Sequence, residues 1–226
     1  MTLESLIALL GWGTLVGVDL VSVPQMMIAR PLVAGTVAGA ILGDIDTGLK
    51  LGVVFELLQY DILPVGAVRY PEYGPATVAA VATAHAAVGA LGLGLGAVVG
   101  LVTGLLGGVT MHLLRRLNSR IVNAAAPALE SGDPRVLVRL HVGGLLRDVA
   151  RAALVTGLGL ALAWTVPPFL TGVFTPRAAT LMAGAAIAAA FAAGTAGTLR
   201  LVGRGPNLAW LAAGLAGGVV VAVWLR

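Results

Sequence analysis

The stretch PLVAGTVAGAILGDIDTGLKLGVVFELLQYDILPVG, residues 31–66, decides the fold. Its first apolar run, 31–43, has about 13 residues, too few to cross roughly 30 Å of hydrocarbon at about 1.5 Å per helical residue. Its second run carries Lys50, Glu56 and Asp61 among apolar residues. Short or polar-interrupted runs of this kind are tolerated at membrane depth only where they line a protein cavity. The stretch therefore predicts broken or re-entrant membrane helices.

The composition of the whole chain agrees with a membrane protein. Hydrophobic residues make up 58% and charged residues 11%, with a mean hydropathy of +0.98, whereas soluble domains carry about 25% charged residues. The 32 glycines favour close helix packing in a bilayer. We read seven apolar segments: 5–23, 31–43, 48–66, 76–114, 150–170, 178–202 and 207–225. The predicted fold class is an all-α membrane protein, a polytopic helical bundle with short re-entrant or broken hydrophobic segments.

The chain divides into three regions. Residues 1–114 form an N-terminal membrane region with a polar substrate-site segment at 44–77, and residues 152–226 form a C-terminal membrane region. The long apolar segment of the first region should bend at GALGLGLGAVVG (89–100). Between the two membrane regions, residues 115–151 hold seven arginines: Arg115, Arg116, Arg120, Arg135, Arg139, Arg147 and Arg151. By the positive-inside rule this segment should lie on the cytoplasmic membrane surface as a solvated anchor, or alternatively form a docking surface for a partner.

Two kinds of carboxylate occur in the polar middle of the chain. Asp44 and Asp46 in GDIDTGLK suit a hydrated turn, in which Asp46 would cap a helix starting near Thr47. Glu56 lies among apolar residues in LGVVFELLQY, and an ionisable group at membrane depth costs about 3 kcal/mol unless it faces a partner or a wet cavity. Glu56 is therefore either functional or paired with an arginine such as Arg30 or Arg69.

The segment QYDILPVGAVRYPEYGPAT (59–77) predicts a binding site. Its Asp61, Arg69 and Glu72 are interleaved with prolines, so a regular transmembrane helix is excluded. Irregular backbone leaves polar groups free for a ligand, carboxylates accept paired hydroxyl donors, and tyrosine rings cover sugar rings. These residue types suit a carbohydrate ligand, but the spacing of the carboxylates is equally compatible with a cation or proton site.

These residues also resemble a known family. RPLVAGTVAGAILGDIDTGLKLGVVFELL (30–58) is similar to the IIC subunit of the mannose–fructose–sorbose family of bacterial phosphotransferase systems, with its Arg-Pro-Leu start, Leu-Gly-Asp, Thr-Gly and a glycine-rich run ending in Glu56. The later Gly66-Ala67 and Pro71-Glu72 fall where the family has Gly-Ala and Pro-Asp. The resemblance covers about residues 1–80, and Arg226 ends the chain about one hydrophobic segment earlier than the family pattern.

The resemblance implies a multi-pass permease subunit of the bacterial inner membrane. Such a subunit pairs with a homologous IID subunit, and homo-oligomers of IIC–IID units are expected. Together they carry a hexose, while cytoplasmic IIA and IIB proteins relay phosphate from phosphoenolpyruvate on their own histidines. The chain itself would then be no enzyme, with no catalytic residue, metal or cofactor and no nucleic-acid partner. His85 and His141 accordingly lack any nucleophilic context.

For the site, we expect the three carboxylates to bind the sugar and two arginines and a glutamine to assist. The expected residues are Glu56, Asp61, Glu72, Gln25, Arg30 and Arg69. Two other functions remain open: an ion- or proton-coupled transporter that uses the same carboxylates, and a non-transporting regulatory scaffold whose arginine segment recruits a partner.

Overall fold

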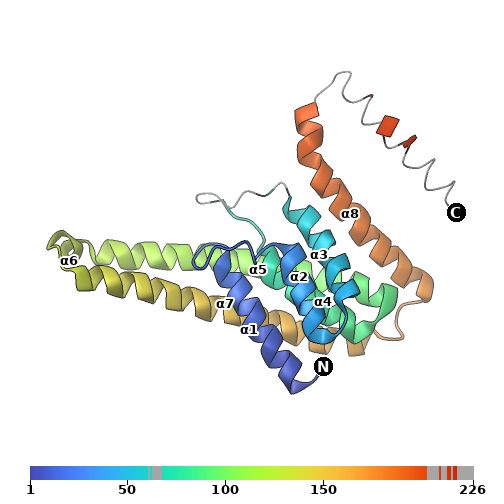
Figure 1. Cartoon of the computed structure of the whole chain (residues 1–226), viewed down its shortest axis with the longest axis horizontal. Helices are drawn as coiled ribbons and strands as arrows, with labels where there is room; N and C mark the ends of the chain where they lie inside the picture. The colour runs from blue at the N-terminus through green and yellow to red at the C-terminus, as the bar shows by residue number, and fades with distance from the viewer. Residues whose placement is uncertain (61, 63–67, 203–208, 210–212, 215, 218–226) are drawn as a thin grey trace.

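A computed structural model of the chain describes residues 1–60, 62, 68–202, 209, 213–214 and 216–217. The helices are α1 (Leu3–Asp19), α2 (Pro31–Leu42), α3 (Ile45–Gln59), α4 (Tyr73–Ala87), α5 (Gly89–Ala124), α6 (Ala126–Glu130), α7 (Pro134–Leu170) and α8 (Pro176–Val202). No strand occurs in the part of the chain so described. In Figure 1, α1 to α4 gather against α5 and α7, and α8 runs obliquely at one end.

The predicted mixture of long and short membrane helices is confirmed. Among the described residues, three helices are long and apolar enough to cross a membrane: Gly89–Ala124, Pro134–Leu170 and Pro176–Ala196. By contrast, α2 has 12 residues, and α3 and α4 have 15 each. At about 1.5 Å per residue none of these three spans the hydrocarbon. Other helices enclose α4 almost wholly, whereas α2 and α3 are each only partly buried.

Helices α2 and α3 form a tight hairpin because small residues face each other. A Cβ on Gly35 would lie 2.6 Å from the carbonyl oxygen of Gly48, and a Cβ on Gly48 would lie 2.4 Å from that of Gly35. Gly43 closes α2 in the left-handed conformation at φ 73°, which glycine adopts without steric cost. The two backbones are therefore in direct contact.

The cap of α3 differs from the sequence-based prediction. Asp44, not Asp46, is the N-cap, and its Oδ1 accepts the N–H of Thr47 at 3.1 Å. Asp46 already lies in the first helical turn and pairs with Lys50. The prediction was wrong because a cap needs a non-helical backbone three residues before the N–H that it accepts.

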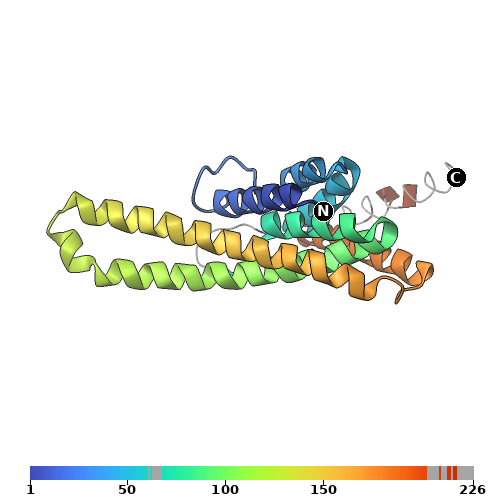
Figure 2. The ribbon, with the colours of Figure 1, turned by 90° about the horizontal axis from the view of Figure 1, so that it is seen from below.

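The predicted bend in the fourth apolar segment is present at the start of GALGLGLGAVVG. Val88 and Gly89 take φ values of 53° and 66° and separate α4 from α5. The following glycines continue α5 and let it approach α4. A Cβ on Gly92 would lie 2.5 Å from the Ala84 carbonyl oxygen. Figure 2 shows α4 enclosed between α5, α7 and the α1–α3 layer.

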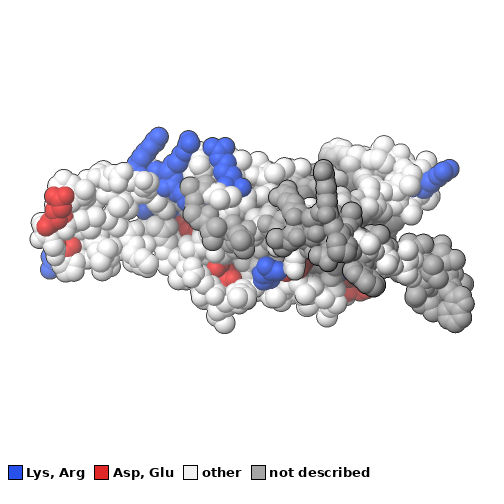
Figure 3. Space-filling model, turned by 90° about the horizontal axis from the view of Figure 1, so that it is seen from above, with Lys and Arg blue, Asp and Glu red and all other residues white. Residues whose placement is uncertain are grey.

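Residues 115–151 are continuous with membrane helices. They form the end of α5, all of α6 and the first half of α7, which extend from the bundle as an antiparallel helical hairpin (Figures 1 and 2). Figure 3 shows cationic side chains projecting from this half of the molecule and acidic ones at its far tip. The prediction of a solvated anchor is wrong for Asp148 and Arg151, which are buried in the bundle.

Candidate functional site

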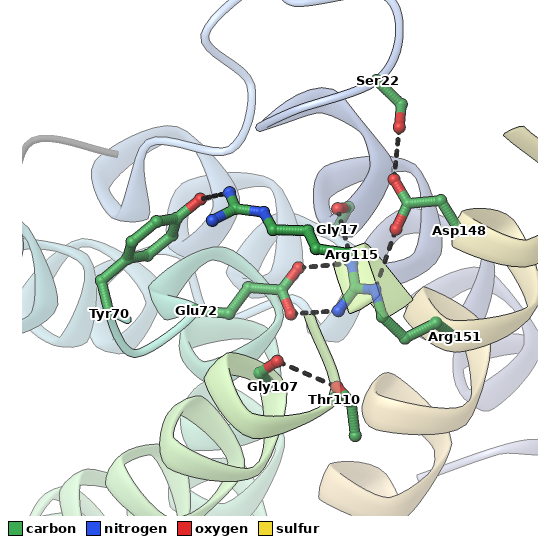
Figure 4. Close-up of polar contacts among 9 residues, drawn as sticks. All are labelled: Gly17, Ser22, Tyr70, Glu72, Gly107, Thr110, Arg115, Asp148 and Arg151. Carbon is green, nitrogen blue, oxygen red and sulfur yellow. Dashed lines mark hydrogen bonds and ion pairs between the residues drawn. The ribbon is translucent and has the colours of Figure 1, made fainter. Parts of the chain in front are cut away.

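A buried ion cluster ties four parts of the chain together (Figure 4). Arg151 of α7 donates from both terminal nitrogens to Glu72, at 2.5 and 3.0 Å, and from Nε to Asp148 at 2.8 Å. Its Nη2 also donates to the carbonyl oxygen of Gly17 at 3.1 Å, and Ser22 donates to the other oxygen of Asp148 at 2.5 Å. We call Glu72, Asp148 and Arg151 the Glu72 cluster.

Glycines create the space that holds Glu72. A Cβ on Gly107 would lie 2.7 Å from Glu72 Oε2, and a Cβ on Gly17 would lie 3.3 Å from Oε1. The Glu72 N–H donates to the Gly104 carbonyl oxygen at 2.9 Å. Glu72 is 1% exposed and Arg151 6%, so bidentate pairing is what makes their burial tolerable. The cluster fixes the segment before α4 to α1, α5 and α7.

Arg115 holds the neighbouring segment from the other side. Its Nη2 donates to the hydroxyl of Tyr70 at 2.9 Å, its Nη1 approaches the Val68 carbonyl oxygen at 3.4 Å, and its guanidinium lies 5.5 Å from the Tyr70 ring centre. Residues 68–72 thus reach α4 as an extended strap anchored to α5 and α7.

A second ion pair lies on the short helices. Arg30, the residue before α2, pairs with Glu56 Oε1, and Glu56 Oε2 accepts the N–H of Leu32 at 3.1 Å. The arginine side chain is 42% exposed and the glutamate side chain 21%. Glu56 therefore combines the electrostatic support of a cation and a helix N-terminus with a partly exposed side chain. This is one of the two pairings, with Arg30 or with Arg69, that the sequence offered as the alternative to a free functional glutamate.

The loop before α2 is built around Asp19. Both Asp19 oxygens accept backbone N–H groups, from Met26 at 2.7 Å and Ala29 at 3.0 Å. Gln25 is exposed in this loop at φ 59°. Asp19 was missed at the sequence level, although a carboxylate at the end of an apolar helix, followed by the irregular SVPQMM, was a usable signal.

The structure separates the predicted site residues into different places. Arg30 and Glu56 lie together, Glu72 belongs to the buried cluster, and Gln25 is on the exposed loop. Asp61 lies outside the described residues. Within the described chain, Arg69 contacts His112 Nε2 at 3.2 Å and no carboxylate.

The sequence reading also missed two members of the Glu72 cluster. Asp148 and Arg151 are an i,i+3 pair at the start of an apolar run, and that placement was the available signal. Among the described residues no three metal-ligating side chains come together.

The chain is similar to known sugar-transport components. The family model for the sorbose-specific IIC component of the phosphotransferase system matches residues 3–223. The mannose-specific EIIC component of Escherichia coli K12 is 25% identical over 130 residues, covering 58% of this chain and 48% of that protein. The sorbose-specific EIIC component of Klebsiella pneumoniae is 32% identical over 116 residues, covering 51% and 43%. The chain thus spans about half the length of the curated relatives it matches.

The fold is also that of a solved transporter. A chain in the cryo-EM structure of the mannose transporter ManYZ with microcin E492 superposes with a TM-score of 0.52 at 19% identity, covering 100% of this chain and 96% of that one. At this identity the likeness shows the fold alone. The family model, however, covers nearly the entire sequence, and it confirms the resemblance found in residues 30–58. The chain belongs to the sorbose-type IIC family of the phosphotransferase system, and it is a multi-pass inner-membrane protein.

Proposed function

We propose that this protein is the permease subunit that carries a hexose across the inner membrane together with a IID subunit. In this proposal cytoplasmic IIA and IIB proteins carry out phosphoryl transfer, and the IIC–IID units assemble into homo-oligomers. Family membership and the ManYZ-like fold support the proposal. The observation that carries it is the accessible Arg30–Glu56 pair on helices too short to span the bilayer.

Glu56 has the chemistry that a sugar site needs. Its carboxylate is held by Arg30 and by the Leu32 N–H, yet it keeps 21% of its side-chain surface exposed. A carboxylate held in this way can accept two adjacent hydroxyl donors, and such bonds are stronger than those between neutral groups. An accessible carboxylate at membrane depth is a functional-site hypothesis in its own right.

The other predicted residues take different parts in the proposal. Gln25 and Asp61 remain proposed sugar ligands, and Arg69 remains a proposed support. Glu72 acts as an anchor in the described conformation, because both of its oxygens accept from Arg151.

The space between the loop before α2, the end of α3 and the strap is closed in this conformation. It measures about 10 Å³ and is lined in part by Gln59, Tyr70 and Tyr73, whereas small-molecule pockets measure roughly 300 Å³ or more. Sugar entry by this route therefore requires the loop and the strap to separate.

Uptake of labelled hexoses tests the proposal. Cells would express the chain with or without a IID subunit, as wild type or as Glu56→Gln, in a host that supplies IIA and IIB. We expect the sugar to accumulate as its phosphate only with the partner present. Glu56→Gln should lower the rate at least about ten-fold, because a neutral amide removes a charge-assisted hydrogen bond to the substrate.

Asp46→Asn is the matched control. Asp46 is a carboxylate on the same helix, but its side chain is 74% exposed and paired only with Lys50, so uptake should be unchanged. Absence of uptake of any hexose by the partnered, membrane-inserted wild type would refute the transport proposal. Sugar-independent proton or cation flux that depends on Glu56 would instead favour the ion-coupled alternative.

A further inference from the structure

A polar cavity beside the Glu72 cluster has no role in the proposed sugar path. It encloses about 420 Å³ between the loop after α1, the end of α5 and the first half of α7. Its polar lining includes Ser22, Arg115, Asn118, His141, Arg147 and Asp148. The carboxylate of Asp148 is already engaged by Arg151 and Ser22, so cationic groups decide which ligand the cavity favours.

Arg147 is the main cationic group offered to this cavity. Its Nε donates to Asn118 Oδ1 at 2.8 Å, which fixes the plane of the guanidinium. The guanidinium of Arg147 packs against Gly143. A Cβ at position 143 would lie 3.2 Å from the Arg147 Nη1 atom. Within the described chain its two terminal nitrogens have no acceptor. A half-buried, oriented guanidinium whose terminal Nη1–Nη2 edge is free matches an oxyanion such as phosphate.

The cavity lies where both long helices leave the hydrocarbon. The apolar run of α5 ends at Leu114 and is followed by Arg115, and the apolar run of α7 begins after Arg151. The bond between Arg147 and Asn118 shows that these polar ends lie at the same level. By the positive-inside rule this is the cytoplasmic interface, where the leaflet carries anionic headgroups.

The remainder of the lining favours a lipid over a soluble phosphate. Apolar side chains of both helices and of the loop complete the cavity: Val21, Val23, Met111, Leu114, Val122, Leu140 and Leu145. A sugar phosphate would need hydroxyl partners on those walls. A phospholipid needs cations for its phosphate and apolar surface for its glycerol and upper acyl groups, which is what this cavity presents.

We infer that the cavity between α5 and α7 binds the phosphate headgroup of an anionic phospholipid, with Arg147 as its cationic contact and His141 as a hydrogen-bond donor. The lipid stabilises the base of the α5–α7 hairpin, beside the Glu72 cluster. The inference stands independently of sugar transport, because it uses none of the residues proposed to bind the hexose.

Native mass spectrometry of the full chain, purified in neutral detergent, tests the inference. Phosphatidylglycerol would be titrated against phosphatidylcholine, which has the same acyl chains but no net charge. We expect phosphatidylglycerol to be retained preferentially, and Arg147→Gln to weaken its binding about five-fold, as loss of one cation near an anionic headgroup does. His141→Leu, which removes the hydrogen-bond donor, should weaken binding in the same direction. His141 makes no hydrogen bond within the described chain, so it decides the test if Arg147→Gln does not fold.

Arg139→Gln is the matched control, because Arg139 lies exposed on the same helix and does not line the cavity. It should leave lipid retention unchanged. Equal retention of the two lipids, or equal losses in Arg139→Gln and the cavity variants, would overturn the inference. Displacement of phosphatidylglycerol by excess inorganic phosphate would identify a soluble-phosphate site instead of a lipid site and would overturn it as well.

Discussion

Replacing Arg151 should destabilise the protein more than any other single loss of charge in the described chain. Arg151→Met keeps most of the side-chain volume but removes the bonds to Glu72 and Asp148, at 2.5, 3.0 and 2.8 Å. The two carboxylates are 1% and 2% exposed, so both are left buried and without their shared cation. Breaking a buried pair by removing one partner costs about 3–5 kcal/mol.

The free energy of unfolding can be measured in mixed micelles, with the tryptophan fluorescence as the signal. Glu72→Gln should cost less, about 1.5–3 kcal/mol, because it removes the charge but keeps an acceptor for Arg151. The double variant should cost less than the sum of the two single changes, since each removes the same interaction. Arg139→Met, on the exposed part of the same helix, should stay within about 0.5 kcal/mol of wild type.

The reasoning would be refuted if Arg151→Met lay within about 1 kcal/mol of wild type, the worth of one ordinary hydrogen bond. Strictly additive effects of the two substitutions would refute it in another way, because they would show that Glu72 and Arg151 do not act on each other.

Two further predictions concern the α2–α3 hairpin. Gly48→Ala should destabilise the protein by about 1–3 kcal/mol, because its Cβ would lie 2.4 Å from a carbonyl oxygen of α2. Gly11→Ala in α1, with no atom within 4 Å of the new Cβ, should instead stabilise the helix by about 0.5–1 kcal/mol; thermal unfolding distinguishes the two. Asp44→Ala should cost about 1 kcal/mol as a lost N-cap, whereas Asp46→Ala should be neutral. The hydrogen bonds from Thr47 lower the pKa of Asp44, so its contribution is complete above about pH 4 and is lost as the pH falls through the lowered pKa; unfolding measured across acidic pH checks this.

Much of the fold was predictable because the signals are local. The length of an apolar run decides whether a helix can span the bilayer, and residues 31–43 were recognised as too short on that ground alone. A bend within residues 89–100 was likewise expected from the glycine-rich sequence, and the structure places it at the start of that stretch, at Val88 and Gly89. Both features depend on the preferences of neighbouring residues.

The remainder could not be read from the sequence because it depends on distant contacts. Glu72 and Arg151 are 79 residues apart, and no local sequence pattern around either residue predicts that the two pair. Arg151 was grouped with the exposed arginines by composition, but the turn of α7 on which it lies faces Glu72 and α1. Burial of a charge is set by tertiary packing, so a run of arginines cannot reveal which member is internal.

The same limit applies to the two membrane glutamates, and resolving it changes the functional argument. In the sequence, Glu56 and Glu72 are equivalent candidates for a ligand site. In the structure, both oxygens of Glu72 accept hydrogen bonds from Arg151, and glycines of neighbouring helices pack directly against its side chain. The side chain of Glu56, supported by Arg30, keeps 21% of its surface accessible. Glu56 can share its carboxylate with a sugar while it stays paired with Arg30, because the pair is partly exposed. Glu72 would first have to break its buried pair with Arg151, which costs about 3–5 kcal/mol. We therefore propose Glu56 as the glutamate that binds the substrate, and Glu72 as a structural anchor.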